Sequence, residues 1–152
     1  MNASNPYRMW LEDHFRRADP WDYGETGGAR HQQALELLPA HTGRTLELGC
    51  AEGHFTVLLA ERAAEVLALE LVAEAAQRAR VRTAGIPTVS VRQADILQRL
   101  PLRQFDTVVC MDLLYYVPVR MQSGVAARIA RRVAPGGALL LQHQRDRVVA
   151  EW

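Results

Sequence analysis

Short apolar runs alternate with stretches of helical periodicity from residue 44 onward, and this alternation constrains the fold more than any other feature of the chain. Three of the runs, VLALEL, FDTVVCM and ALLLQ, are almost continuously apolar, which is typical of strands covered on both faces of a sheet. Strands that alternate with helices build parallel, doubly wound sheets. The sequence therefore predicts an α/β fold with a mainly parallel sheet and helices on both faces.

The pattern also assigns the individual elements. The predicted strands are 45–49, 65–71, 88–94, 105–114 and 138–143, and the predicted helices are 6–18, 29–38, 53–63, 73–84 and 119–134. The breakers Gly85-Ile86-Pro87 and Pro135-Gly136-Gly137 are expected to end the helices before them. We expect a single domain, in which residues 1–43 form an N-terminal helical lid segment and 44–152 form the α/β core.

Composition narrows the range of partners. The 152 residues carry a net charge of +1, which favours neither nucleic acid nor an anionic membrane as the main partner. No apolar run is long enough to span a bilayer. Cys50 and Cys110 are too few for a disulfide framework, so reduced thiols and a cytoplasmic location are expected.

The stretch TLELGCAEGHF, residues 45–55, places two glycines between a predicted strand and a predicted helix. Glycine at such a loop lets the backbone approach a ligand, or simply a neighbouring element. The chain has no lysine, which excludes a Walker phosphate loop, and Ala51 replaces the middle glycine of the dinucleotide fingerprint. Glu47 and Glu52 would repel a pyrophosphate. A ligand with cationic character is therefore favoured.

Two further carboxylates follow the next two predicted strands. Glu70 ends the second strand, where a carboxylate can accept hydrogen bonds from both hydroxyls of a ribose. Asp95 ends the third strand, where it can accept from an exocyclic amine such as that of adenine, or cap the following turn. Acidic signals at successive strand ends are more specific together than any one alone, because ligands of open α/β sheets bind at these ends.

The series ELGCAEG, LALELV, QADIL and FDTVVCMDLLYY resembles the class I S-adenosylmethionine-dependent methyltransferases, over roughly residues 44–144. Within this class, PWDY, LELGCAEGHFT and DLLYYV are similar to the nodulation-type N-methyltransferases, although Gly28-Ala29 occupies the place of their typical tyrosine–glutamate pair. The resemblance implies a Rossmann-like methyltransferase sheet, S-adenosylmethionine as cofactor, and a small-molecule acceptor. The acceptor group would be an amine or hydroxyl, for example of a sugar or a secondary metabolite.

Candidate site residues follow from the loop, the strand ends and the resemblance. The candidate cofactor contacts are Glu47, Gly49, Cys50, Ala51, Gly53, Glu70, Leu71, Asp95, Ile96, Asp112 and Tyr23. The candidate bases near the transfer centre are Asp112, His54 and His143, and no metal site is expected. Arg30 and His31 are candidates for the cofactor carboxylate. The alternatives are that the glycines serve close packing, that the histidines lie on the surface, and that Trp21 and Tyr23 only fill a groove.

Two other functions stay open at this point. The chain could be a cofactor-binding module without catalysis. It could also be a nucleotide-dependent oxidoreductase, which is less favoured because the third glycine is missing.

At the C-terminus, 147–152 is strand-like and either forms an antiparallel hairpin with 138–143 or is a tail. An uncovered strand 138–143 would indicate that the C-terminal strands of the fold are truncated, or that the chain forms a homodimer through this edge.

Overall fold

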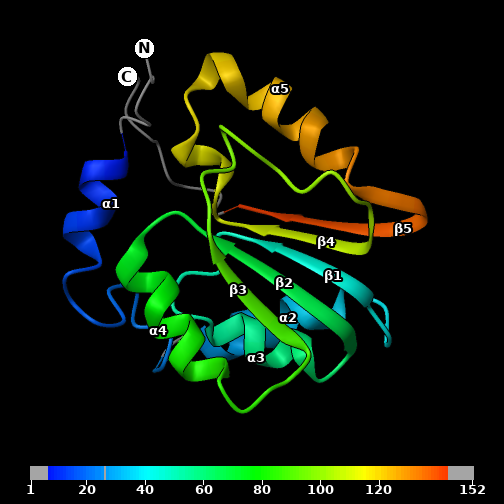
Figure 1. Cartoon of the computed structure of the whole chain (residues 1–152), viewed down its shortest axis with the longest axis horizontal. Helices are drawn as coiled ribbons and strands as arrows, with labels where there is room; N and C mark the ends of the chain where they lie inside the picture. The colour runs from blue at the N-terminus through cyan, green and yellow to red at the C-terminus, as the bar shows by residue number, and fades with distance from the viewer. Residues whose placement is uncertain (1–6, 26, 144–152) are drawn as a thin grey trace.

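The sheet has the predicted parallel, doubly wound topology. The computed structural model describes residues 7–25 and 27–143, and its five strands are all parallel in the order β3-β2-β1-β4-β5 (Figure 1). They are β1 Gly43–Leu48, β2 Ala63–Glu70, β3 Val89–Gln93, β4 Phe105–Met111 and β5 Val133–Gln142. The strand order reverses between β1 and β4, which is where such sheets bind their ligands.

Helices cover both faces of this sheet. They are α1 Arg8–His14, α2 Gly27–Glu36, α3 His54–Ala60, α4 Ala73–Thr83, the 3₁₀ helix η1 Leu114–Tyr116 and α5 Val119–Ala130. Leu46, Leu67 and Val108 pack against Val125 and Ile129 of α5 on one face. On the other face, residues of α2, α3 and α4 pack against the remaining inward positions of the strands, and Figure 1 shows the two layers on opposite sides of the sheet.

Several boundaries differ from the predicted ones, most of all before the last strand. The predicted helix 119–134 ends at Ala130, and β5 already begins at Val133. The Pro135-Gly136-Gly137 breaker therefore lies inside β5, where the register shifts between the pairs Phe105–Val133 and Thr107–Ala138. Gly136 has φ 75°, and a Cβ on Gly137 would lie 2.7 Å from the carbonyl oxygen of Asp106. Glycine thus permits an irregularity in the strand instead of ending a helix.

Smaller corrections affect the other predicted elements. The helix predicted over 53–63 ends at Ala60, the strand predicted over 105–114 ends at Met111 and is followed by η1, and the helix predicted over 6–18 is described only over Arg8–His14. The predicted strand 147–152 lies outside the described residues. Within 7–25 and 27–143, no helix has the length and apolar character needed to cross a membrane.

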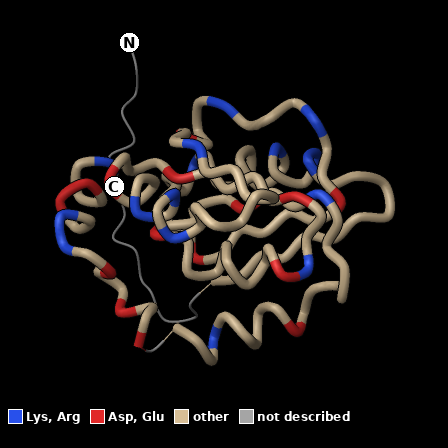
Figure 2. Tube along the Cα trace, turned by 60° about the horizontal axis from the view of Figure 1, so that its bottom comes forward, with Lys and Arg blue, Asp and Glu red and all other residues tan. Residues whose placement is uncertain are grey.

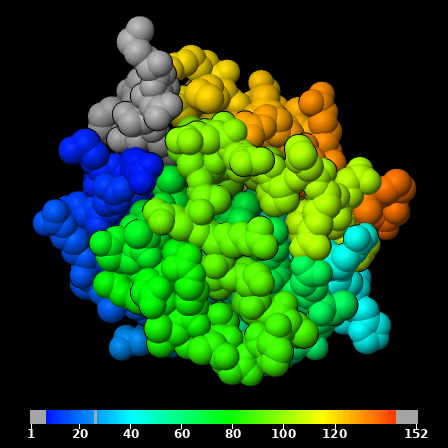
Figure 3. Space-filling view, in the orientation of Figure 1, coloured from blue at the N-terminus to red at the C-terminus, as the bar shows by residue number. Residues whose placement is uncertain are grey.

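The described part of the N-terminal segment packs directly on the core. Tyr7, Leu11 and Phe15 form a buried cluster with Val72 and Ala75 at the start of α4, and Figure 3 shows α1 beside α4 on one face of the molecule. Basic and acidic residues are interspersed along the chain (Figure 2). The division into a lid and a core remains a prediction.

Candidate functional site

The loops that follow β1, β2, β3 and β4 surround a cavity that the N-terminal segment closes on one side. The lining residues of the strand ends include Gly49, Ala51, Glu70, Leu71, Asp95, Ile96 and Asp112, and those of the N-terminal segment include Leu11, Phe15, Trp21, Tyr23 and Arg30. A smaller cavity beside it shares Tyr23, Arg30, Gly49, Ala51 and Asp112 and adds His31, Glu47, Cys50 and His54. The structure thus brings together ten of the eleven candidate cofactor contacts, and only Gly53 lies outside both linings.

Gly49 lies where the first loop approaches the loop after β4. Its φ is 74°, and an added Cβ would collide with Cδ1 of Leu113. Its N–H donates to the carbonyl oxygen of Leu69 at 2.8 Å. A side chain is therefore disfavoured, because this φ strains residues other than glycine and the added Cβ would push the tip of the Leu113 side chain aside. The backbone of this loop lines the cavity.

Glu70 fixes the same loop to the end of β2. Its Oε2 accepts a hydrogen bond from the N–H of Ala51 at 2.9 Å, and its Oε1 accepts from the N–H of Val72 at 2.8 Å. Burial raises the pKa of Glu70, and these backbone hydrogen bonds oppose that rise. Each carboxylate oxygen has a second lone pair, so the group can still accept from a ligand hydroxyl in the cavity.

Asp95 both caps a turn and lines the larger cavity. Its Oδ1 accepts from the N–H of Leu97 at 2.9 Å, and its Oδ2 lies 3.3 Å from Nε2 of Gln98. The two interpretations of this residue, turn cap and ligand acceptor, are therefore compatible. Ile96 beside it is 8% exposed and belongs to the core under the cavity, while Leu71 is half-buried at the wall.

Glu47 is a buried acid beneath the smaller cavity. Oγ1 of Thr56 donates to its Oε2 at 2.6 Å. Burial raises the pKa of Glu47 to about 7, and the hydrogen bond from Thr56 opposes this effect. Burial likewise raises the pKa of the Cys50 thiol, so this cysteine is a small buried wall residue and not a nucleophile.

Asp112 is joined to Arg30 by an ion pair that the sequence did not indicate. The guanidinium of Arg30 contacts Oδ2 of Asp112, and both residues line both cavities. Asp112 has φ 50° at the end of β4, and its side chain is 9% exposed. The pair places one positive and one negative group at the junction of the two cavities.

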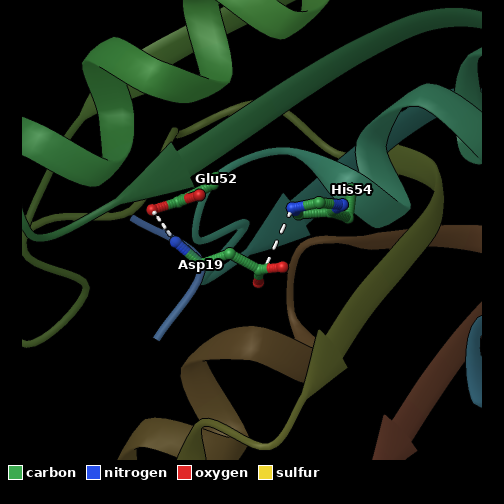
Figure 4. A group of neighbouring side chains, drawn as sticks. All are labelled: Asp19, Glu52 and His54. Carbon is green, nitrogen blue, oxygen red and sulfur yellow. Dashed lines mark hydrogen bonds and ion pairs between the residues drawn. The ribbon is translucent and has the colours of Figure 1, made fainter. Parts of the chain in front are cut away.

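The two candidate histidines differ in their placement. His54 lines the smaller cavity, where burial and then Arg82 lower its pKa, so a neutral imidazole is favoured. Its Nε2 lies 3.8 Å from Oδ1 of Asp19 (Figure 4). His143 is exposed and lines neither cavity, although its ring centroid is 6.1 Å from that of the cavity residue Tyr115. The structure does not bring His143 into the site.

Gly53 and Glu52 face away from the cavities. Gly53 has φ 82°, and an added Cβ would lie 3.2 Å from Cα of Ala79, so the described contacts of this glycine are those of close loop–helix packing. Glu52 is 3% exposed and bonds the backbone of Asp19 and the side chain of Arg78. The expectation that Glu52 would repel a pyrophosphate at this loop stays a prediction.

Comparison with known proteins identifies the family. The sequence model of the family described as Nodulation protein S (NodS) matches residues 4–152. The chain belongs to the NodS family. Nodulation protein S of Bradyrhizobium diazoefficiens (strain USDA 110) is 28% identical over 148 residues, which cover 93% of this chain and 70% of that protein.

Solved structures of NodS and of a similar protein share the fold. The N-methyltransferase NodS from Bradyrhizobium japonicum WM9, in complex with S-adenosylhomocysteine, matches with a TM-score of 0.80 and 31% identity over 87% of this chain and 70% of that one. A DhpI complex with the same ligand matches with a TM-score of 0.75 and 29% identity over 87% and 64%.

By family and fold, the chain belongs with the S-adenosylmethionine-dependent methyltransferases of the NodS type. It spans 70% of the length of NodS from Bradyrhizobium diazoefficiens, 58% of that from Rhizobium tropici and 64% of the DhpI chain. The activity and acceptor of the whole protein are therefore proposals.

Proposed function

We propose that the protein binds S-adenosylmethionine across the two adjoining cavities and transfers its methyl group to an amine of a small molecule. The observation that carries this proposal is the convergence of Gly49, Glu70 and Asp95, from three successive strand ends, on the larger cavity. The amine is favoured over a hydroxyl because the matching NodS structure is that of an N-methyltransferase.

The described residues fit the parts of this cofactor. Glu70 has lone pairs for the ribose hydroxyls, and Asp95 can accept from the adenine amine, while Leu71 and Ile96 supply apolar walls for the purine. In the smaller cavity, Arg30 can pair with the carboxylate of the methionine part. Glycine at 49 leaves the loop without a side chain at this point.

The chemistry asks little of the protein beyond alignment. The methyl carbon is already activated by the positive sulfur, so an amine lone pair attacks it, the carbon–sulfur bond breaks, and a neutral thioether leaves. Holding both reactants in line can contribute on the order of 7–11 kcal/mol. The faces of Tyr115 and Tyr116, which line the larger cavity, can stabilise the sulfonium charge.

The reacting amine must lose a proton. We propose that His54 or Asp112 accepts it, directly or through water, because both line the smaller cavity. The lowered pKa of His54 favours its unprotonated form, which is the form a general base needs. His143 was a third candidate, and its exposed position outside both cavities gives this role no support.

Calorimetry with S-adenosylhomocysteine tests the binding site. Glu70→Ala should weaken binding by about 1.5–3 kcal/mol, since it removes hydrogen bonds to a charged group. Glu74→Ala, at an exposed position on neighbouring α4, is the control and should bind as the wild type does. Equal affinity of Glu70→Ala and the wild type would contradict the ribose assignment.

Turnover separates a methyltransferase from a cofactor-binding module. Formation of S-adenosylhomocysteine from S-adenosylmethionine should depend on an added primary or secondary amine. If hydroxyl compounds alone support turnover, the amine assignment is wrong. If the cofactor binds and no acceptor of either type supports turnover, the binding-module alternative holds.

Oligomeric state and location also belong to the proposal. We infer a homodimer through β5, supported by the position of β5 at the edge of the described sheet and by the exposure of Leu139 (41%) and Leu141 (44%). Light scattering that shows a monomer would contradict it.

A cytoplasmic location is supported by the two free, buried cysteines, Cys50 and Cys110.

A further inference from the structure

Glu52 is the one acid of the first loop that turns away from the cavities, and it joins three segments of the chain. Its Oε1 accepts a hydrogen bond from the backbone N–H of Asp19 at 2.9 Å and from Nη1 of Arg78, on α4, at 2.7 Å. Its carbonyl oxygen accepts from Nε of Arg82, also on α4, at 2.8 Å. The side chain is almost completely buried, so this ion pair is weakly screened by solvent.

Arg78 extends the same connection along the N-terminal segment. Besides Glu52, its Nη1 lies within hydrogen-bonding distance of the carbonyl oxygens of Phe15, at 2.9 Å, and Arg17, at 3.1 Å. Glu52 and Arg78 therefore hold residues 15–19 through backbone atoms alone. They fix the path of the chain, whatever its side chains are.

This path determines a wall of the larger cavity. The carboxylate of Asp19 accepts from the N–H groups of Tyr23, at 2.8 Å, and Gly24, at 2.7 Å. Phe15, Trp21 and Tyr23 line the cavity. Glu52 and Arg78 together thus form a clamp on this segment. The connection from the clamp to the cavity has two steps, from Glu52 to Asp19 and from Asp19 to Tyr23 (Figure 4 shows the first).

The segment does not favour this path by its own backbone preferences. Asp19 has φ 45° and Asp22 has φ 52°, and left-handed conformations at non-glycine residues cost on the order of 1 kcal/mol or more each. Such a path persists only where surrounding groups hold it. Glu52 bonds the segment from the loop and Arg78 bonds it from α4, and His54 adds a contact with Asp19.

We propose that Glu52 and Arg78 are positioning residues for the cofactor site, which hold residues 15–24 as the closed wall of the larger cavity. Neither residue lines a cavity, so their effect on binding passes through the wall. The proposal rests on the function given above. The loop after β1, which approaches the cofactor, would then also anchor residues 15–24, which cover the cofactor.

A metal site is the alternative for this cluster. Ligand atoms of Asp19, Glu52 and His54 lie within 4.8 Å of one another. However, the oxygens of Asp19 and Glu52 already accept hydrogen bonds from three backbone N–H groups and from Arg78. The positive guanidinium of Arg78, in direct contact with Glu52, would repel a metal cation bound there. The clamp accounts for these contacts without an ion.

Two matched arginine variants on α4 test the clamp. Arg78→Gln should raise hydrogen exchange across 15–24 in the free protein and weaken S-adenosylhomocysteine binding about tenfold. In turnover it should raise KM for S-adenosylmethionine more than it lowers kcat, because saturating cofactor closes the wall again. Arg80→Gln, the control, changes an exposed arginine whose described bonds go to Gln77 and Val91, and should behave as the wild type does.

Glu52→Gln supplies a second variant that keeps an acceptor oxygen for Asp19 but loses the charge, and it should show an intermediate loss of affinity. Faster exchange with unchanged affinity in Arg78→Gln would overturn the positioning role, and unchanged exchange would overturn the clamp itself. A gain in thermal midpoint on adding Zn²⁺, absent in His54→Ala, would favour the metal site instead. If the wild type binds no S-adenosylhomocysteine, the proposed function fails, and exchange in the free protein still decides the clamp.

Discussion

At the scale of single residues, Glu47 makes stability depend on pH in the direction opposite to most carboxylates. Its ordinary pKa is 4.5, and burial raises the pKa to about 7 in the folded protein. Between these values the folded state binds more protons than the unfolded state, so stability falls as pH rises and the loss is complete above about pH 7. Glu47→Gln removes this loss and should raise the free energy of unfolding by on the order of 2–3 kcal/mol at pH 8. Urea unfolding at pH 8 and pH 4 checks it, since the gain should nearly vanish at pH 4; an equal gain at both pH values would show another cause.

The roles of residues at strand ends could be predicted from the sequence. The roles of residues whose direction depends on the loop backbone could not. Gly49, Glu70 and Asp95 follow strands whose carboxyl ends must meet at one edge, so their convergence was readable from the sequence. The direction of the Glu52 side chain could not be predicted, because it depends on the left-handed conformations of Ala51 and Gly53 on either side. The Arg30–Asp112 pair joins an early helix to a late strand, and no local pattern reports such a contact.

At the scale of elements, β5 shows how a breaker motif can belong to a strand. The sequence predicted the alternation correctly, because apolar runs and helical periodicity are strong local signals. It misplaced Pro135-Gly136-Gly137, because only the pairing of β5 with β4 shows that glycine is needed against the carbonyl oxygen of Asp106.

A pair of glycine substitutions tests this view of β5. Gly137→Ala places a Cβ 2.7 Å from the carbonyl oxygen of Asp106 and 2.9 Å from that of Ala134, and should lower the free energy of unfolding by about 1–3 kcal/mol. Gly124→Ala, inside α5 with nothing within 4 Å of the added Cβ, should raise it by about 0.5–1 kcal/mol. Chemical denaturation measures both, and a Gly137→Ala variant as stable as the wild type would show that the strand can shift to make room.

At the scale of the whole molecule, the cavity lies where the N-terminal segment meets the loops at the carboxyl ends of the strands. The apolar core beneath α5 reaches it through Ile96, and the N-terminal cluster reaches it through Leu11 and Phe15. A ligand there contacts groups that are together only in the folded state, so its binding energy adds to the stability of the fold. Ligand at a hundred times its dissociation constant should stabilise the fold by about 2.7 kcal/mol.

For a domain of this size, that energy corresponds to a rise of about 5–10 °C in the thermal midpoint. S-adenosylhomocysteine should produce this rise. NAD should not, because Ala51 replaces a fingerprint glycine and the buried acid Glu47 lies beneath the loop, so a pyrophosphate is disfavoured. Differential scanning fluorimetry with each ligand measures the shift, and Glu70→Ala at the same ligand concentration should show a smaller one. A rise with NAD that equals the rise with S-adenosylhomocysteine would contradict this prediction, since it would mean that the site recognises the shared adenosine and not the methionine part.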